Sequence, residues 1–262
     1  MRGTDYTEKL LATGRCTFTT EDLVDELGKT RVAANAVIRR LRKQNRVATP
    51  VRGFHVVVPP RYRQLGCLPP QEFVPFLMKY LGRKYYAGLL TAASFHGAAH
   101  QQPQSFQILI DERRRDVECA SVRIEFHERR VLSRVPVELI NTDYGQLTIS
   151  TPEATAIDLV GYAGQFGGLD RVATVLVELG EKLDGDSLRE FGPHVAPDAW
   201  LQRLGYLLDE VGWSSTSDGL VEYVEKNVEE VTLLHPSPKG RSGVPRNQKW
   251  KVAVNYEVSS DL

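Results

Sequence analysis

Apolar positions in the first part of the chain recur at the spacing of short helices. Residues 6–13 have a helical tendency, and residues 18–19 are β-prone and extended. Thr20 is the expected N-cap of a second helix, because its hydroxyl can accept a backbone N–H and the two acids after it favour the positive helix end. Gly28 supplies the turn residue that ends this helix.

A third helix is predicted over residues 31–44, with Thr30 as its N-cap. At about 100° per residue its side chains separate into two faces. The apolar face, which can pack against the preceding helix, consists of Ala34, Val37, Ile38 and Leu41. The opposite face consists of Arg31, Asn35, Arg39, Arg42 and Lys43. Two helices joined by a short glycine-containing turn, the second with a basic outer face, are typical of a helix-turn-helix.

A β-hairpin is predicted directly after this helix. Residues 46–49 and 54–58 are β-branched or aromatic in character, and the Pro and Gly between them indicate a turn. A hairpin in this place is a wing, and Arg52 is expected at its tip, near phosphate or the minor groove. Asn45 stands before the hairpin where winged helices often have glycine, and asparagine can also adopt the left-handed conformation.

The rest of the chain has a mixed pattern. Proline pairs bracket a linker at 61–68, and helices are expected over 72–81 and 84–97. Strands are then predicted at 106–110, 122–127, 137–140 and 147–149. Thr151 and Pro152 are an expected N-cap and first helical residue, and further helices are predicted at 169–183, 199–211 and 220–228, with an extended stretch at 250–254.

These elements predict an N-terminal winged helix-turn-helix followed by a mixed α/β C-terminal domain with a helical second half. We expect the DNA-binding domain over residues 1–63 and the C-terminal domain over 64–262, with a sub-boundary near 150.

Charge separates the same two parts. The chain has 33 Lys and Arg against 33 Asp and Glu, a net charge of zero. Residues 1–63 contain 13 Lys and Arg against 6 Asp and Glu, a net of +7, so the rest contains 20 against 27, a net of −7. A small basic module attached to an acidic body is the pattern expected when one end of a chain binds a polyanion.

Cysteine usage and hydropathy predict a cytoplasmic protein. Cys16, Cys67 and Cys119 are widely spaced and odd in number, which favours neither a disulfide framework nor a cysteine-rich zinc site. Charges interrupt every apolar run at the N-terminus, so we expect no signal peptide. We also expect no membrane span, because eighteen consecutive apolar residues occur nowhere.

The predicted contacts with DNA divide by chemistry. Arg31 and Asn35 are expected to reach base edges, arginine by a bidentate fork to guanine and asparagine by a donor and an acceptor to adenine. Thr30 opens the same helix, and Arg39 is suited to bases or phosphates. The residues expected on phosphates are Arg42, Lys43, Arg46 and Arg52. A basic segment near the C-terminus contains Lys239, Arg241, Arg246, Lys249 and Lys251. We expect it either to make a secondary contact with DNA backbone or a partner, or to be an exposed connection.

The sequence gives little indication of a catalytic site or a metal site. His96 and His100 are four residues apart, but Gly97 lies between them and no nearby carboxylate completes a ligand set. The glycines from Gly161 to Gly168 lack the GK[ST] of a phosphate loop, and they indicate a helix end instead. We therefore expect no enzyme activity, no metal and no cofactor.

Over most of its length the chain resembles the AbiEi family, the AbiE-type antitoxins of bacterial type IV toxin–antitoxin systems. The resemblance rests on the winged helix with residues 46–54, on the small-residue stretch 85–93 (YYAGLLTAA), and on His96-Gly97 with Gln104 and Phe106-Gln107. Further matches are Thr151-Pro152-Glu153, Asp158-Leu159 and residues 203–208 (RLGYLL). The small-residue stretch is moderately specific, whereas the winged helix alone is not.

The resemblance implies a repressor of its own operon, acting at inverted repeats in the promoter, and a C-terminal domain that counteracts a nucleotidyltransferase-like toxin in phage defence. Whether the toxin is bound directly stays open. Binding as a homodimer or as two cooperating molecules is expected, because isolated winged helices gain specificity by doubling. The alternative is a transcriptional regulator whose C-terminal domain senses a ligand or dimerises.

Overall fold

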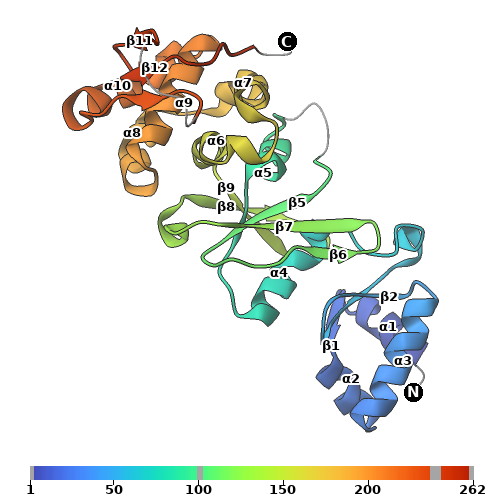
Figure 1. The fold of residues 1–262 in the computed structure, drawn as a ribbon. Coiled ribbons are helices and arrows are strands. Elements are labelled where there is room, and N and C mark those ends of the chain that lie inside the picture. The colour runs from blue at the N-terminus through green and yellow to red at the C-terminus, as the bar shows by residue number, and fades with distance from the viewer. Residues whose placement is uncertain (1–2, 99–102, 237–242, 260–262) are drawn as a thin grey trace. The chain divides into compact units, whose positions relative to one another are not determined.

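The computed structural model of the chain describes residues 3–98, 103–236 and 243–259. Contacts among them divide the chain into two compact units, each with helices and strands, so the fold is mixed α/β (Figure 1). The first unit contains Met1–Ala87, Gln104–Leu132 and Leu139–Ile149, and the second contains Gly88–Pro103, Ser133–Glu138 and Ser150–Leu262. The expected boundary between residues 63 and 64 falls inside the first unit, so the domain division stays a prediction.

The N-terminal elements are helices packed on a small antiparallel sheet with the strand order β1-β3-β2, drawn in blue in Figure 1. Their bounds are α1 Gly3–Ala12, β1 Thr17–Thr19, α2 Thr20–Leu27, α3 Arg31–Lys43, β2 Val47–Val51 and β3 Phe54–Val57. The helices and the hairpin predicted here are confirmed as elements. Gly28 caps α2 in the left-handed conformation, and Asn45 also has a positive φ, of 50°.

The N-cap predicted at Thr20 is wrong by one residue. Thr19 caps α2: its hydroxyl accepts a hydrogen bond from the Asp22 amide at 3.0 Å, and its own amide donates to the Asp22 carboxylate at 2.7 Å. A reciprocal capping box needs an acidic or amide side chain three residues after the cap. Asp22 meets this requirement for Thr19, whereas Leu23 cannot meet it for Thr20.

A larger mixed sheet contains six strands among the described residues, in the order β6-β7-β5-β4-β9-β8. The bounds are β4 Tyr86–Ala87, β5 Phe106–Ile110, β6 Val117–Cys119, β7 Val122–Glu128, β8 Val137–Asn141 and β9 Gln146–Ser150, and helix α4, Pro70–Leu81, precedes them after the 3-10 helix η1, Pro60–Tyr62. The helix predicted over 84–97 is wrong in its first part. Residues 86–87 form a strand, and helix α5 begins only at Leu89.

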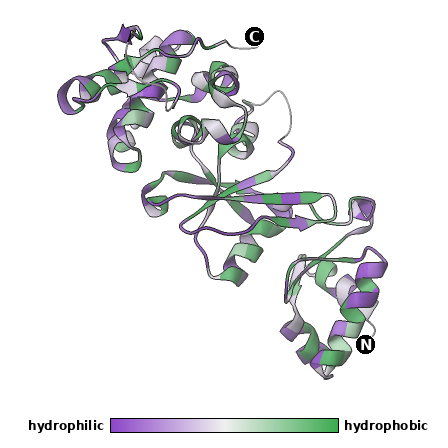
Figure 2. Cartoon of the chain, viewed as in Figure 1, coloured by the Kyte–Doolittle hydropathy of each residue, from purple (hydrophilic) through white to green (hydrophobic). Residues whose placement is uncertain are grey.

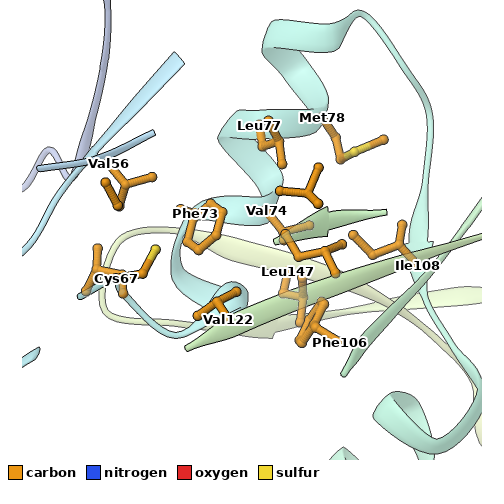
Figure 3. Packing of buried hydrophobic residues seen from close by; sticks show 14 of the residues in the cluster. Val56, Cys67, Phe73, Val74, Leu77, Met78, Phe106, Ile108, Val122 and Leu147 are labelled. Carbon is orange, nitrogen blue, oxygen red and sulfur yellow. The ribbon is translucent and has the colours of Figure 1, made fainter. Parts of the chain in front are cut away.

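Strand β3 is buried on both faces, which joins the N-terminal elements to α4 and the larger sheet. Val57 belongs to a core with Ile38 and Leu41 of α3. Val56 belongs to another core, together with Phe73 and further residues of α4 and the sheet, as Figure 3 shows. Because side chains alternate across a strand, β3 supplies both cores at once. Residues 54–58 therefore have packing partners on both faces of the strand.

Helices dominate the second unit. The bounds of the helices are α5 Leu89–Phe95, α6 Pro152–Gly161, α7 Gly168–Leu179, α8 Gly185–Val195, α9 Asp198–Glu210 and α10 Ser214–Asn227, and a small sheet is formed by β10 Thr232–Leu233, β12 Val252–Ala253 and β11 Arg246–Asn247. The predicted cap at Thr151 is confirmed, since its hydroxyl accepts from the Ala154 amide at 3.4 Å. Helix α8 was not expected, because Gly192 and Pro193 inside it weaken its sequence signal.

No helix within the described ranges combines the length and the apolar character that crossing a bilayer requires.

Candidate nucleic-acid interface

A hollow of about 270 Å³ lies between helix α3 and the β2–β3 hairpin. It is lined by Thr20, Arg31, Asn35, Ile38, Arg39, Arg42, Thr49, Arg52, Gly53 and His55. Five of these are residues that the sequence predicts as DNA contacts: four from α3, and Arg52 from the hairpin turn. The hollow thus brings together cationic and amide side chains that come from two separate elements.

The orientation of α3 follows from its amphipathic sequence. Ala34, Ile38 and Leu41 are buried in the core shared with β2 and β3. The predicted contact residues on α3 are all exposed. Figure 2 shows hydrophilic and hydrophobic positions side by side along this helix. Burial of one stripe leaves the other free to meet solvent or a ligand.

Arg52 is placed by the hairpin turn. The turn residues Arg52 and Gly53 separate β2 from β3, and Gly53 has a φ of 85°, which glycine adopts without strain. The Gly53 carbonyl accepts a hydrogen bond from the Thr20 amide at 3.0 Å, and the Arg52 carbonyl accepts one from the Tyr80 hydroxyl at 3.2 Å. The backbone on either side of the turn is therefore anchored, while the Arg52 side chain is exposed.

His55, which lines the hollow, ties the hairpin to helix α2. Its Nε2 lies 2.9 Å from the Thr20 hydroxyl and its Nδ1 lies 3.0 Å from the Thr49 hydroxyl. A neutral imidazole has one donor and one acceptor nitrogen, and a hydroxyl can serve either. Burial lowers the pKa of His55 from 6.5 to about 4, the charge of Arg42 lowers it as well, and Glu21 opposes them.

The importance of His55 was not predicted from the sequence. The pattern placed it in a strand between apolar neighbours and assigned it no role. The available signal is a titratable side chain inside an otherwise apolar strand, where burial requires hydrogen-bond partners. Those partners, Thr20 and Thr49, lie 35 and 6 residues away and come together only in the fold.

Two arginines of the predicted interface form ion pairs within the chain. Arg31 Nη2 lies 3.1 Å from Glu21 Oε1, with both side chains largely exposed. Arg46 Nη1 lies 3.3 Å from Glu8 Oε1. Exposed pairs of this kind contribute about 0–1 kcal/mol, so a stronger anion can replace the carboxylate.

Three predicted contact residues do not line the hollow. Thr30 caps α3, its hydroxyl accepting a hydrogen bond from the Ala33 amide at 3.3 Å. Lys43 is exposed near the end of α3, and Arg46 lies at the start of the hairpin. Their contact with DNA stays a prediction.

Two lysines of the basic segment near the C-terminus, Lys249 and Lys251, are engaged within their own unit. Lys249 lies 2.9 Å from Asp209 and 3.3 Å from Asp218. Lys251 donates to carbonyls at the end of α10, including that of Val224 at 2.9 Å, where a cation complements the helix dipole. Arg246 is exposed in β11. Lys239 and Arg241 lie outside the described residues.

Among the residues that the structure describes, no group of three or more His, Cys, Asp or Glu side chains is placed so that it could hold a metal ion. His96 is buried, and its Nε2 lies 2.8 Å from the Ser150 carbonyl. His100 lies outside the described residues.

Burial of His55 predicts a specific loss of stability in acid. Above about pH 6.5 the imidazole is neutral in the folded and unfolded chain, and the full stability is present. As the pH falls toward 4, the unfolded chain takes up the proton and the folded chain does not, which costs roughly 3 kcal/mol. We expect His55→Gln to lose less stability than wild type between about pH 7 and pH 4.5, measured by urea unfolding.

The control is His194→Gln, at an exposed position of α8, which should keep the wild-type pH dependence. An NMR titration of the folded protein in which His55 protonates near pH 6.5 would contradict the prediction that burial keeps this imidazole neutral.

Comparison with solved structures shows the fold. The RV2827C protein from Mycobacterium tuberculosis has a TM-score of 0.67 to this chain at 18% identity, over 94% of this chain and 89% of that chain. An antigenic nucleotidyltransferase-like protein from Paracoccidioides brasiliensis covers 57% of this chain and 90% of its own at 8% identity, and its TM-score of 0.38 is too low to indicate a shared fold. A search of curated proteins gave no match.

A family comparison covers the middle of the chain. Residues 86–210 match the model of the AbiEi antitoxin C-terminal domain. The match begins at strand β4 and ends with helix α9, and so includes all six described strands of the larger sheet and helices α5 to α9. It confirms the resemblance drawn from the small-residue stretch 85–93 and from residues 203–208. Residues 86–210 of this chain, just under half of its length, are therefore similar to the AbiEi antitoxin C-terminal domain.

Proposed function

We propose that the N-terminal elements form a winged helix-turn-helix that binds duplex DNA in a sequence-specific manner. Helix α3 is the recognition helix, and the β2–β3 hairpin is the wing. The observation that carries the proposal is the hollow in which Arg31, Asn35 and Arg39 of α3 meet Arg52 of the hairpin turn. The net charge of +7 over residues 1–63 supplies the attraction to a polyanion.

The proposed contacts follow from side-chain chemistry and position. Arg31 and Asn35, in the first turns of α3, reach base edges in the major groove. Arg39 and Arg42 line the same hollow further along the helix. The proposed phosphate contacts are Arg42, Lys43, Arg46 and Arg52, which position the protein without reading sequence. Thr30 fixes the helix N-terminus that faces the groove.

We further propose that the chain represses its own operon at promoter inverted repeats. A recognition helix with one wing contacts few base pairs, so two copies on a repeat double the recognised sequence. The proposed DNA-binding surface excludes Lys249 and Lys251, because contacts within the second unit engage both.

The proposed role of the whole chain is that of an antitoxin in a type IV toxin–antitoxin system, in which it counteracts a nucleotidyltransferase-like toxin without an enzymatic step. Support comes from the AbiEi antitoxin C-terminal domain over residues 86–210. A plain transcriptional regulator would share the DNA-binding surface but would give no protection from a toxin.

Substitutions of the proposed base contacts and of the proposed phosphate contacts should weaken DNA binding in different ways. Arg31→Ala or Asn35→Ala should each cost about 1–3 kcal/mol and relax discrimination at a base pair. Arg52→Ala should weaken binding to all sequences and reduce the salt dependence by about one released ion. Fluorescence anisotropy on a duplex of the gene's own promoter, at several salt concentrations, measures both effects.

The matched control is Arg189→Ala, an exposed arginine on α8 paired with Asp186. It should bind promoter DNA as wild type does. Wild-type affinity and an unchanged footprint in Arg31→Ala, Asn35→Ala and Arg52→Ala alike would exclude the proposed recognition face.

Repression and toxin antagonism should be separable in the full-length chain. Because β3 contributes to both cores of the first unit, removing residues 1–63 would take Phe54, Val56 and Val58 away and expose their core partners Phe73, Val74 and Leu77. Surface substitutions avoid this problem. We expect the triple variant Arg31→Ala/Asn35→Ala/Arg52→Ala to lose repression of a promoter reporter and still rescue cells that express the toxin of the same operon.

Failure of the wild-type chain to rescue, with repression intact, would favour the plain regulator. Loss of rescue in the triple variant at a normal protein level would show that DNA binding is required for antagonism.

A further inference from the structure

Val32 is the most exposed large apolar side chain among the described residues, at 80%. It lies in the first turn of α3 and contributes to neither core of the first unit. A β-branched residue also has a lower helix propensity than alanine or a long polar side chain. Neither packing nor helix formation therefore accounts for valine at this position.

The helical spacing places Val32 on the proposed recognition face. Asn35 and Arg39 follow it by three and seven residues, which puts the three side chains on one side of the helix. Asn35 and Arg39 line the hollow. The buried residues Ala34 and Ile38 belong to the opposite side.

The charges on α3 identify what can cover Val32. The helix contains no acidic residue, and its basic residues are Arg31, Arg39, Arg40, Arg42 and Lys43. An apolar side chain on a helix whose charged residues are all cationic fits a surface that is strongly anionic around a small apolar group. The major groove of DNA is such a surface, because phosphates flank the 5-methyl group that thymine presents there.

We infer that Val32 reads thymine: its side chain contacts the 5-methyl group of a thymine in each bound half-site. The inference rests on the proposed DNA binding and adds the base chemistry at one position. Asn35, on the next turn, is suited to adenine, so the target should be A·T-containing where the first turns of α3 lie.

Replacing thymine with uracil tests the inference, because it removes that methyl group and leaves base pairing intact. Sequences bound by the full-length chain are first selected from a random duplex pool. Each thymine of the selected site is then changed to uracil in turn. At one thymine of each half-site, wild-type affinity should fall about fourfold, the effect of burying roughly one methyl group.

Variants at Val32 connect the effect to this side chain. Val32→Ala should bind the thymine site about as weakly as wild type binds the uracil site, and should not distinguish the two. Val32→Thr keeps one methyl group and should retain part of the discrimination. Leu65→Ala removes another exposed apolar side chain of the first unit and should discriminate as wild type does. Because Val32 is 80% exposed, neither Val32→Ala nor Val32→Thr disturbs a core.

The outcomes separate this inference from the function on which it rests. A pool without any enriched sequence would overturn sequence-specific DNA binding, and thymine recognition with it. Selective binding in which uracil is tolerated at every position, or in which Val32→Ala still prefers thymine, would overturn thymine recognition by Val32 alone.

Discussion

The packing of one side of α3 determines everything proposed for the first unit. Ala34, Ile38 and Leu41 are buried with Val47 and Val57 of the small sheet. Fully burying an aliphatic side chain contributes about 1.5–3 kcal/mol, so rotating the helix about its axis would be costly. Fixed in this way, α3 presents its arginines, Asn35 and Val32 outward. The stability of the fold does not depend on those exposed side chains.

The hairpin is fixed to this helix by a second, polar constraint. His55 joins Thr20 at the start of α2 to Thr49 in β2, and stays neutral because it is buried. Strand β3, which carries His55, also packs against α4 and the larger sheet through its other face. The proposed DNA-binding elements therefore have one core of their own and share a second core with the part of the chain where the family match begins.

Periodicity in the sequence was sufficient to predict most elements, including the two faces of α3, because an amphipathic helix has a strong repeating signal. It failed at β4, since Tyr86 and Ala87 form a strand too short to have a period. It also failed to distinguish engaged cations from free ones: Lys251 has the sequence context of an exposed basic tail, yet it donates to carbonyls of α10. His55 and Val32 were overlooked because their importance depends on contacts, or on a lack of packing, that only the fold reveals.

Hydrogen–deuterium exchange of the full-length chain, with and without its selected duplex, is the most direct test of α3 as the DNA-binding element. The account predicts slower exchange in residues 30–43 and in the hairpin at 47–57, with little change in α8, α9 and α10. Protection confined to the second unit, in a complex that still selects its sequence, would contradict it.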